Sequence, residues 1–168
     1  MNRNRLLSIA MSVVLIAFTA QAGTGFTADN DDKQPSLSGT MNVKVSNSTV
    51  EWKGASLVIS HHGTMMLKGG YLSFADGKLT GGRIEVDMKS IDDLSLEGAM
   101  SEKLEGHLMS DDFFSADKFP VATFTITKAV HNSKAGKGKP NYSITGTMKI
   151  KGISQKQTFP AHIHIKDG

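Results

Sequence analysis

Residues 101–124 read SEKLEGHLMSDDFFSADKFPVATF, and this stretch decides how the rest of the chain is interpreted. Met100, Leu104 and Leu108 recur every four residues, which places them on one face of a short helix, with His107 beside that face. A buried ring contributes about 1.5–3 kcal/mol to stability. Four of the seven phenylalanines found after residue 22 lie in this stretch, namely Phe113, Phe114, Phe119 and Phe124. The pattern predicts an apolar helical lid packed onto another element.

The residues that follow this helical pattern predict a second helix and the position at which it ends. Ser110 can cap free amides, and Asp111 and Asp112 suit the positive end of a helix dipole. Phe119 precedes Pro120, which favours an extended backbone at Phe119. We therefore expect the helical segment to end there and a strand to begin.

Upstream of residue 101 the pattern changes to strands. Apolar residues alternate with polar ones, as in half-buried strands. A break is expected at Ser60–Gly63, a bulge at Gly69-Gly70, and a tight hairpin at Asp76-Gly77. The alternating apolar positions are Met41, Val43, Val45, Val50, Trp52, Ile84, Val86 and Met88.

Downstream of the lid the alternation returns. A loop is expected over residues 134–140 and a turn at Lys151-Gly152. Strands are expected to contain Phe124 and Ile126, the alternating residues from Tyr142 to Ile150, and the residues from Phe159 to Ile165. Seven or eight antiparallel strands with one helical interruption predict a single all-β domain, either a closed barrel or a sandwich.

The N-terminal residues have the composition of an export signal. Arg3 and Arg5 precede an apolar run over Leu6–Ala20, and Ala20-Gln21-Ala22 is a typical cleavage site. We predict a signal peptide over 1–22, a flexible tether over 23–39 and the β-domain over 40–168. The mature protein is expected in the bacterial periplasm or outside the cell.

Charge and cysteine content exclude several function classes. Without Arg3 and Arg5 the chain has 17 basic and 16 acidic residues, so its net charge is close to zero. The mature chain therefore has no basic excess to match a nucleic acid. The chain has no cysteine, which excludes disulfides and thiol chemistry. No nucleophile elbow, phosphate loop or zinc-protease helix motif is present, and the adjacent acids at Asp92-Asp93 and Asp111-Asp112 are better explained as caps.

The histidines leave an alternative open. His162 and His164 lie two apart on a predicted strand, so they share a face and could bind zinc together with His61 or His62, or with His131 or Glu51. Alternatively, both face solvent while Ile163 and Ile165 face inward. His61 and His62 are consecutive and point to opposite faces, so one of them could be a polar anchor for a ligand or a hydrogen-bonded core histidine.

Eight motifs, in this order and spacing, resemble the YceI-like family over residues 40–165. They are Trp52-Lys53-Gly54, the SHHG of 60–63, GYLSFADG of 70–77, GGRIEVDMKSI of 81–91, KLEGHL of 103–108, DDFF of 111–114, FPVATF of 119–124 and TGTMKIKG of 145–152. The resemblance implies a lipocalin-like antiparallel barrel with a short helical lid, which holds a polyisoprenoid or similar long-chain lipid. It implies neither catalysis nor a cofactor.

The resemblance also suggests site residues. His61 and His107 would be polar positions near the cavity, and the aromatic residues of the lid would line or close it. The predicted ligand-binding residues are Trp52, His61, Leu104, His107, Leu108, Phe113, Phe114, Phe119 and Phe124.

In one respect the chain departs from the family pattern. Members continue past the strand that resembles Thr158–Ile165, and we expect this chain to lack those closing strands. An open strand edge invites pairing with a second copy, so a homodimer is expected as a partner besides the lipid.

The sequence is therefore compatible with three functions. The first is a carrier or sequestering protein for a long-chain lipid. The second is a metal-binding or metal-assisted hydrolytic protein that uses His61 or His62 with His162 and His164. The third is a protein-interaction module with a solid core.

Overall fold

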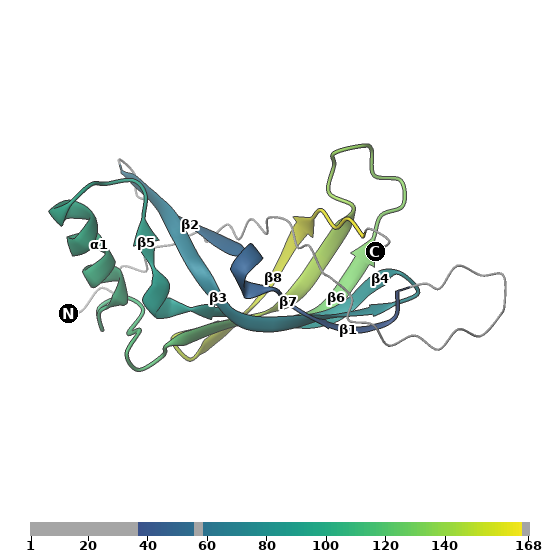
Figure 1. The fold of residues 1–168 in the computed structure, drawn as a ribbon, viewed down its shortest axis with the longest axis horizontal. Helices are drawn as coiled ribbons and strands as arrows, with labels where there is room; N and C mark the ends of the chain where they lie inside the picture. The colour runs from purple at the N-terminus through teal and green to yellow at the C-terminus, as the bar shows by residue number, and fades with distance from the viewer. Residues whose placement is uncertain (1–36, 56–58, 166–168) are drawn as a thin grey trace, which may run out of the picture.

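The described part of the protein is an open, curved antiparallel sheet with one α-helix at one end (Figure 1). A computed structural model describes residues 37–55 and 59–165. The predicted signal peptide, nearly all of the predicted tether and the last three residues lie outside this range. The elements are β1 (Gly39–Asn42), η1 (Val45–Asn47), β2 (Thr49–Ala55), β3 (Ser60–Ala75), β4 (Lys78–Asp87), η2 (Met88–Ser90), β5 (Asp92–Asp93), α1 (Ala99–Met109), β6 (Val121–His131), β7 (Tyr142–Ile150) and β8 (Ile153–Ala161).

Strand β3 is the centre of the sheet, because four strands pair with it. Its first half pairs with β2 on one edge and with β5 on the other, and its second half pairs with β1 and β4. The predicted hairpin is confirmed: Asp76 and Gly77 join β3 to β4 with φ of 49° and 69°, as a type I′ turn requires. The predicted bulge is also confirmed by the register shift between Leu67 and Gly69.

The predicted break at Ser60–Gly63 is wrong, because β3 runs through these residues without interruption. All four of them pair with β2, from Ala55↔Ser60 to Trp52↔Gly63, and Gly63 also pairs with Asp93 of β5. Partners on both edges satisfy the backbone groups, and this outweighs the weak strand preference of the local sequence.

The order β1-β3-β4-β6-β7-β8 confirms an all-β antiparallel architecture of the lipocalin-like kind with one helix. The sheet is not closed: within the described residues β8 pairs with β7 alone. The β7–β8 hairpin turns at Lys151 and Gly152, which both have positive φ, as the sequence predicts. Figure 1 shows α1 at one end of the sheet and the β3–β4 hairpin at the other.

Residues 110–119, which we call the flap, follow α1 without forming the second helix that the sequence predicts. Ser110 ends α1 instead: its N–H bonds to the carbonyls of Gly106 and His107, and its hydroxyl donates to His107 O. Ser115 then has a φ of 49°, which a right-handed helix cannot contain. With Pro120 close behind, the segment is too short to offset the cost of starting a helix.

One lysine of the sheet holds the flap in place, and a second lysine braces the flap internally. Lys151, at the tip of the β7–β8 hairpin, donates from Nζ to the carbonyls of Asp111 (2.8 Å) and Phe113 (2.9 Å). Within the flap, Lys118 pairs with Asp111 at 2.6 Å. The hairpin therefore fixes where the flap lies over the interior.

The interior contains two apolar clusters. The first lies beneath α1 and the flap, and consists of Val50, Trp52, Met65, Leu67, Ile84, Val86, Met88, Ile91, Leu108, Ala116 and Ala122. The second consists of Phe74, Leu79, Phe124, Ile126, Tyr142 and Ile144. Leu72 packs against both, so the apolar interior is continuous. Neither α1 nor any other helix of the described chain is both long and apolar enough to cross a membrane.

Candidate functional site: an apolar pocket beneath the flap

A small apolar pocket lies where β2, β3, α1 and the flap meet. Phe113 and Phe114 enter it from the flap, and their rings pack edge to face with centroids 4.5 Å apart. The apolar side chains that line it come from five segments: Trp52, Met65, Ile91, Leu108, Phe113 and Phe114. The enclosed volume is about 40 Å³. A water molecule needs roughly 10–15 Å³ of such a volume, so the pocket has room for a few water molecules and is too small for a long chain.

The structure brings together most of the predicted apolar site residues. Trp52, Leu108, Phe113 and Phe114 line the pocket, and Leu104 packs against the same cluster. Trp52 is held in place because its indole N–H donates to the carbonyl of Asp92 at 3.2 Å. Met100, predicted on the same helical face, is 63% exposed, so only the second half of α1 faces the interior.

Four predicted site residues lie elsewhere, and the first three are His107, Phe119 and Phe124. His107 is exposed on α1, and its ring centroid is 6.1 Å from that of Phe113. Phe119 is 38% exposed and packs beside Gly152 at the β7–β8 turn. Phe124 belongs to the second cluster, where its ring lies 5.2 Å from that of Phe159. The alternation of β6 explains the last position, since Phe124 and Ile126 share one face of that strand.

His61 is half-buried and takes part in a hydrogen-bonded network rather than lining the pocket. Its Nδ1 lies 2.9 Å from the hydroxyl of Ser95, and that hydroxyl donates to Asp93 Oδ1 at 2.6 Å. Because the hydroxyl proton goes to the carboxylate, the imidazole N–H is the donor to Ser95. This arrangement matches the hydrogen-bonded core histidine considered from the sequence.

Asp93 is the centre of this network and is only 5% exposed. Its carboxylate accepts from the N–H groups of Ser95 (3.1 Å) and Leu96 (3.0 Å) besides the Ser95 hydroxyl. Its own N–H donates to Glu105 of α1 at 2.9 Å, so it connects β5 to the helix. The spacing Asp-x-Ser is a local signal for such a turn, because aspartate accepts from the amide two residues ahead.

The pKa of Asp93 is lowered below its usual 3.8. Burial alone raises the pKa, but the hydrogen bonds from Ser95 and Leu96 outweigh it, and the nearby His61 also favours the carboxylate. A lowered pKa in the folded state gives stability that is present above pH 3.8 and is lost as the pH falls through the folded value.

Replacing Asp93 with alanine should destabilise the protein by about 2 kcal/mol, because two half-buried amides and the Ser95 hydroxyl lose their acceptor. The difference between wild type and variant, measured by urea unfolding, should be constant from neutral pH to about pH 5 and should shrink below pH 4. Asp92→Ala is the matched control, since Asp92 is an exposed neighbour whose carboxylate forms no hydrogen bond or ion pair among the described residues. A difference that does not change with pH would contradict this role for the carboxylate.

The histidine pairs do not form a metal site. His61 and His62 lie on β3, whereas His162 and His164 follow β8 and are exposed, and they alternate with the half-buried Ile163 and Ile165. In the part of the chain that the structure describes, no group of three or more histidine, cysteine, aspartate or glutamate residues could hold a metal ion. The metal hypothesis therefore lacks the converging ligands that it requires.

The comparisons with known proteins agree with this geometry. The family model of the YceI-like domain matches residues 41–168. The chain is 32% identical over 130 residues to a UPF0312 protein of Shewanella denitrificans, which covers 71% of this chain and 63% of that protein. A UPF0312 protein of Pseudomonas putida is 31% identical over 113 residues, which covers 67% of this chain and 54% of the relative. The chain thus spans between about half and two thirds of the length of these relatives.

A solved structure shares the fold. The crystal structure of BcnA from Burkholderia cenocepacia superposes with a TM-score of 0.57 at 20% identity, over 74% of this chain and 72% of that one. The family match extends over most of the described sheet and includes the helix, the flap and the pocket residues. The chain belongs to the YceI-like domain family.

Proposed function

We propose that this protein binds a polyisoprenoid or similar long-chain amphiphilic lipid in its apolar interior. The observation that carries the proposal is the meeting of aromatic and aliphatic side chains from five segments under a flap that is not helical. The family membership supports the same role. Binding alone, without catalysis, is the function proposed.

Burial of an apolar chain is enough to give useful affinity. Each methylene removed from water contributes about 0.8 kcal/mol, so ten of them contribute roughly 8 kcal/mol before ordering costs. That corresponds to binding in the micromolar range. Half-buried apolar side chains along the second cluster, among them Met148 and Phe159, offer further surface to a chain that extends beyond the pocket.

The proposal includes the location and assembly expected from the sequence. The predicted signal peptide would export the protein to the periplasm or beyond, and a second copy would pair at the edge of β8. Cell fractionation and light scattering of the purified protein measure these two properties directly.

The direct test is to purify the protein from the compartment in which it accumulates and to extract it with organic solvent. Mass spectrometry is expected to show an apolar molecule in roughly equal amount to the protein. Trp52 is the single tryptophan of the chain and lines the pocket, so its fluorescence should also change when farnesol is added. Repeatedly empty protein with no response to farnesol would reject the proposal.

The pocket residues supply a sharper test. A Phe113→Ala, Phe114→Ala double variant should bind farnesol at least about tenfold more weakly, because it removes two half-buried rings and a fully buried ring contributes roughly 1.5–3 kcal/mol. Phe119→Ala is the matched control, since it removes the same kind of ring from the same flap but outside the pocket. Equal losses in the double variant and the control would show that the pocket does not hold the ligand.

A further inference from the structure

The sheet forks between β4 and β6. These strands pair from Gly82↔Ile126 to Asp87↔Val121 and no further. Yet β4 begins four residues before Gly82, and β6 continues to His131. The two strands therefore diverge at the end of the sheet that carries the β3–β4 hairpin.

Two β-bulges lie at the fork, one in β4 and one in β6, and the extra residue of each is a threonine. Thr80 is the extra residue of β4 where its register with β3 shifts, and Thr127 is the extra residue of β6 where its register with β7 shifts. Each threonine hydroxyl donates to a carbonyl of the strand on its outer side: Thr80 to Ser73 O at 3.0 Å, and Thr127 to Thr145 O at 3.2 Å. Bulges bend a strand, so this pair directs β4 and β6 apart.

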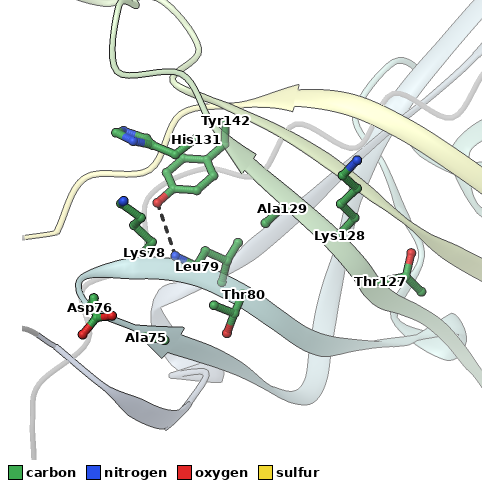
Figure 2. Close-up of a pocket in the computed structure, with 10 residues that line it drawn as sticks. All are labelled: Ala75, Asp76, Lys78, Leu79, Thr80, Thr127, Lys128, Ala129, His131 and Tyr142. Atoms are coloured by element: carbon green, nitrogen blue, oxygen red, sulfur yellow. Dashed lines mark hydrogen bonds between the residues drawn. The ribbon is translucent and has the colours of Figure 1, made fainter.

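The fork opens a cleft of about 390 Å³ whose floor is apolar (Figure 2). Leu79 and Tyr142 lie at the floor and are 2% and 5% exposed. The N–H of Leu79 donates to the hydroxyl of Tyr142 at 3.2 Å, in place of a bond to β6. No residue in the described ranges accepts the proton of that hydroxyl, and Tyr142 lines the cleft.

The sides of the cleft are basic. Lys78, Lys128 and His131 line it, against one acidic residue, Asp76 at the hairpin turn. Neither lysine forms an ion pair within residues 37–55 and 59–165. The ring of His131 packs on that of Tyr142, with centroids 4.9 Å apart. The lysines and the unused hydroxyl proton of Tyr142 suit an oxyanion. The apolar floor suits a hydrocarbon chain attached to that oxyanion.

We infer that this cleft binds the anionic head group, a phosphate or a carboxylate, of an amphiphile whose chain enters the interior. The inference rests on the lipid-binding function proposed above. The floor residues belong to the second apolar cluster, and Leu72 joins that cluster to the first. A chain anchored at the fork can therefore extend toward the pocket under the flap. The helix α1, which carries Leu108 of that pocket, and the β3–β4 hairpin lie at opposite ends of the sheet (Figure 1).

The test compares charged and uncharged probes of the same chain length. Binding of farnesyl phosphate, farnesol, palmitate and hexadecanol to the full chain is measured through Trp52 fluorescence. One of the charged probes should bind more tightly than its alcohol, and the Lys78→Gln, Lys128→Gln double variant should reduce that preference roughly tenfold. The pair that shows the preference identifies the head group as phosphate or carboxylate.

The control variant is Lys68→Gln, Lys156→Gln, which removes the same charge from two exposed lysines outside the cleft and should keep the preference. Equal binding of charged and uncharged probes, or a preference that the cleft variant retains, would overturn the head-group assignment and leave lipid binding intact. Failure of all four probes to bind would overturn the proposed function and this inference with it.

Discussion

Replacing Gly63 with alanine is expected to lower the free energy of unfolding by at least about 3 kcal/mol, at the upper end of what overpacking costs. A Cβ at this position would lie 1.9 Å from the carbonyl oxygen of Asp92 and 2.7 Å from the indole nitrogen of Trp52. The closer of these atoms belongs to the backbone of β5, which is paired with β3 at this point. The backbone cannot rotate away as a side chain can.

Chemical denaturation followed by far-ultraviolet circular dichroism measures this loss. The matched control is Gly69→Ala on the same strand, where an added Cβ meets nothing within 4 Å. We expect that variant to stay within about 0.5 kcal/mol of the wild type. Similar stability of the two variants would mean that β5 does not lie against β3 as described.

Replacing Trp52 with alanine should cost about 3–5 kcal/mol, the range observed for large aromatic residues removed from cores. Its side chain is 8% exposed in the first cluster and lines the pocket. The substitution also removes the N–H donor to Asp92 O. Because the fluorescence of this tryptophan is lost, circular dichroism again gives the unfolding curve.

A conservative variant separates the two contributions. Trp52→Phe keeps a ring in the cluster and removes the hydrogen bond and part of the volume, so it should lose about 1–2 kcal/mol. If the alanine variant lost no more than the phenylalanine variant, the ring would not be part of the core.

Local signals in the sequence predicted most of the strands and the tight turns between them, but they placed the last strand at Phe159–Ile165, whereas β8 is Ile153–Ala161. Asp76-Gly77 and Lys151-Gly152 supply the positive φ that tight hairpins need, and the alternation of β4 and β7 identifies their buried faces. The path through Ser60–Gly63 could not be predicted in this way, because its stability comes from pairing with β2 on one edge and β5 on the other, and β5 follows β3 only after β4 and η2. The same holds for the flap, whose shape depends on contacts with Lys151.

The candidate site was predictable only in part. The density of phenylalanines indicated the flap, and Phe113 and Phe114 do line the pocket with Trp52 and Leu108. Helical periodicity placed His107 beside the apolar face, but it cannot tell how far around α1 the contact extends. The cleft between β4 and β6 was missed, since it depends on bulges in two strands that are about 45 residues apart and carry no sequence motif.

Both ends of the sheet depend on strand β3 for their backbone hydrogen bonds. Strand β2, which carries Trp52 of the pocket, and β5 pair with its first half, and β4, which forms one side of the fork, pairs with its second half. Neither end of the protein can therefore lose its structure without breaking hydrogen bonds on the backbone that also supports the other end. A lipid that occupied either end would, by mass action, protect the whole sheet against proteases and heat.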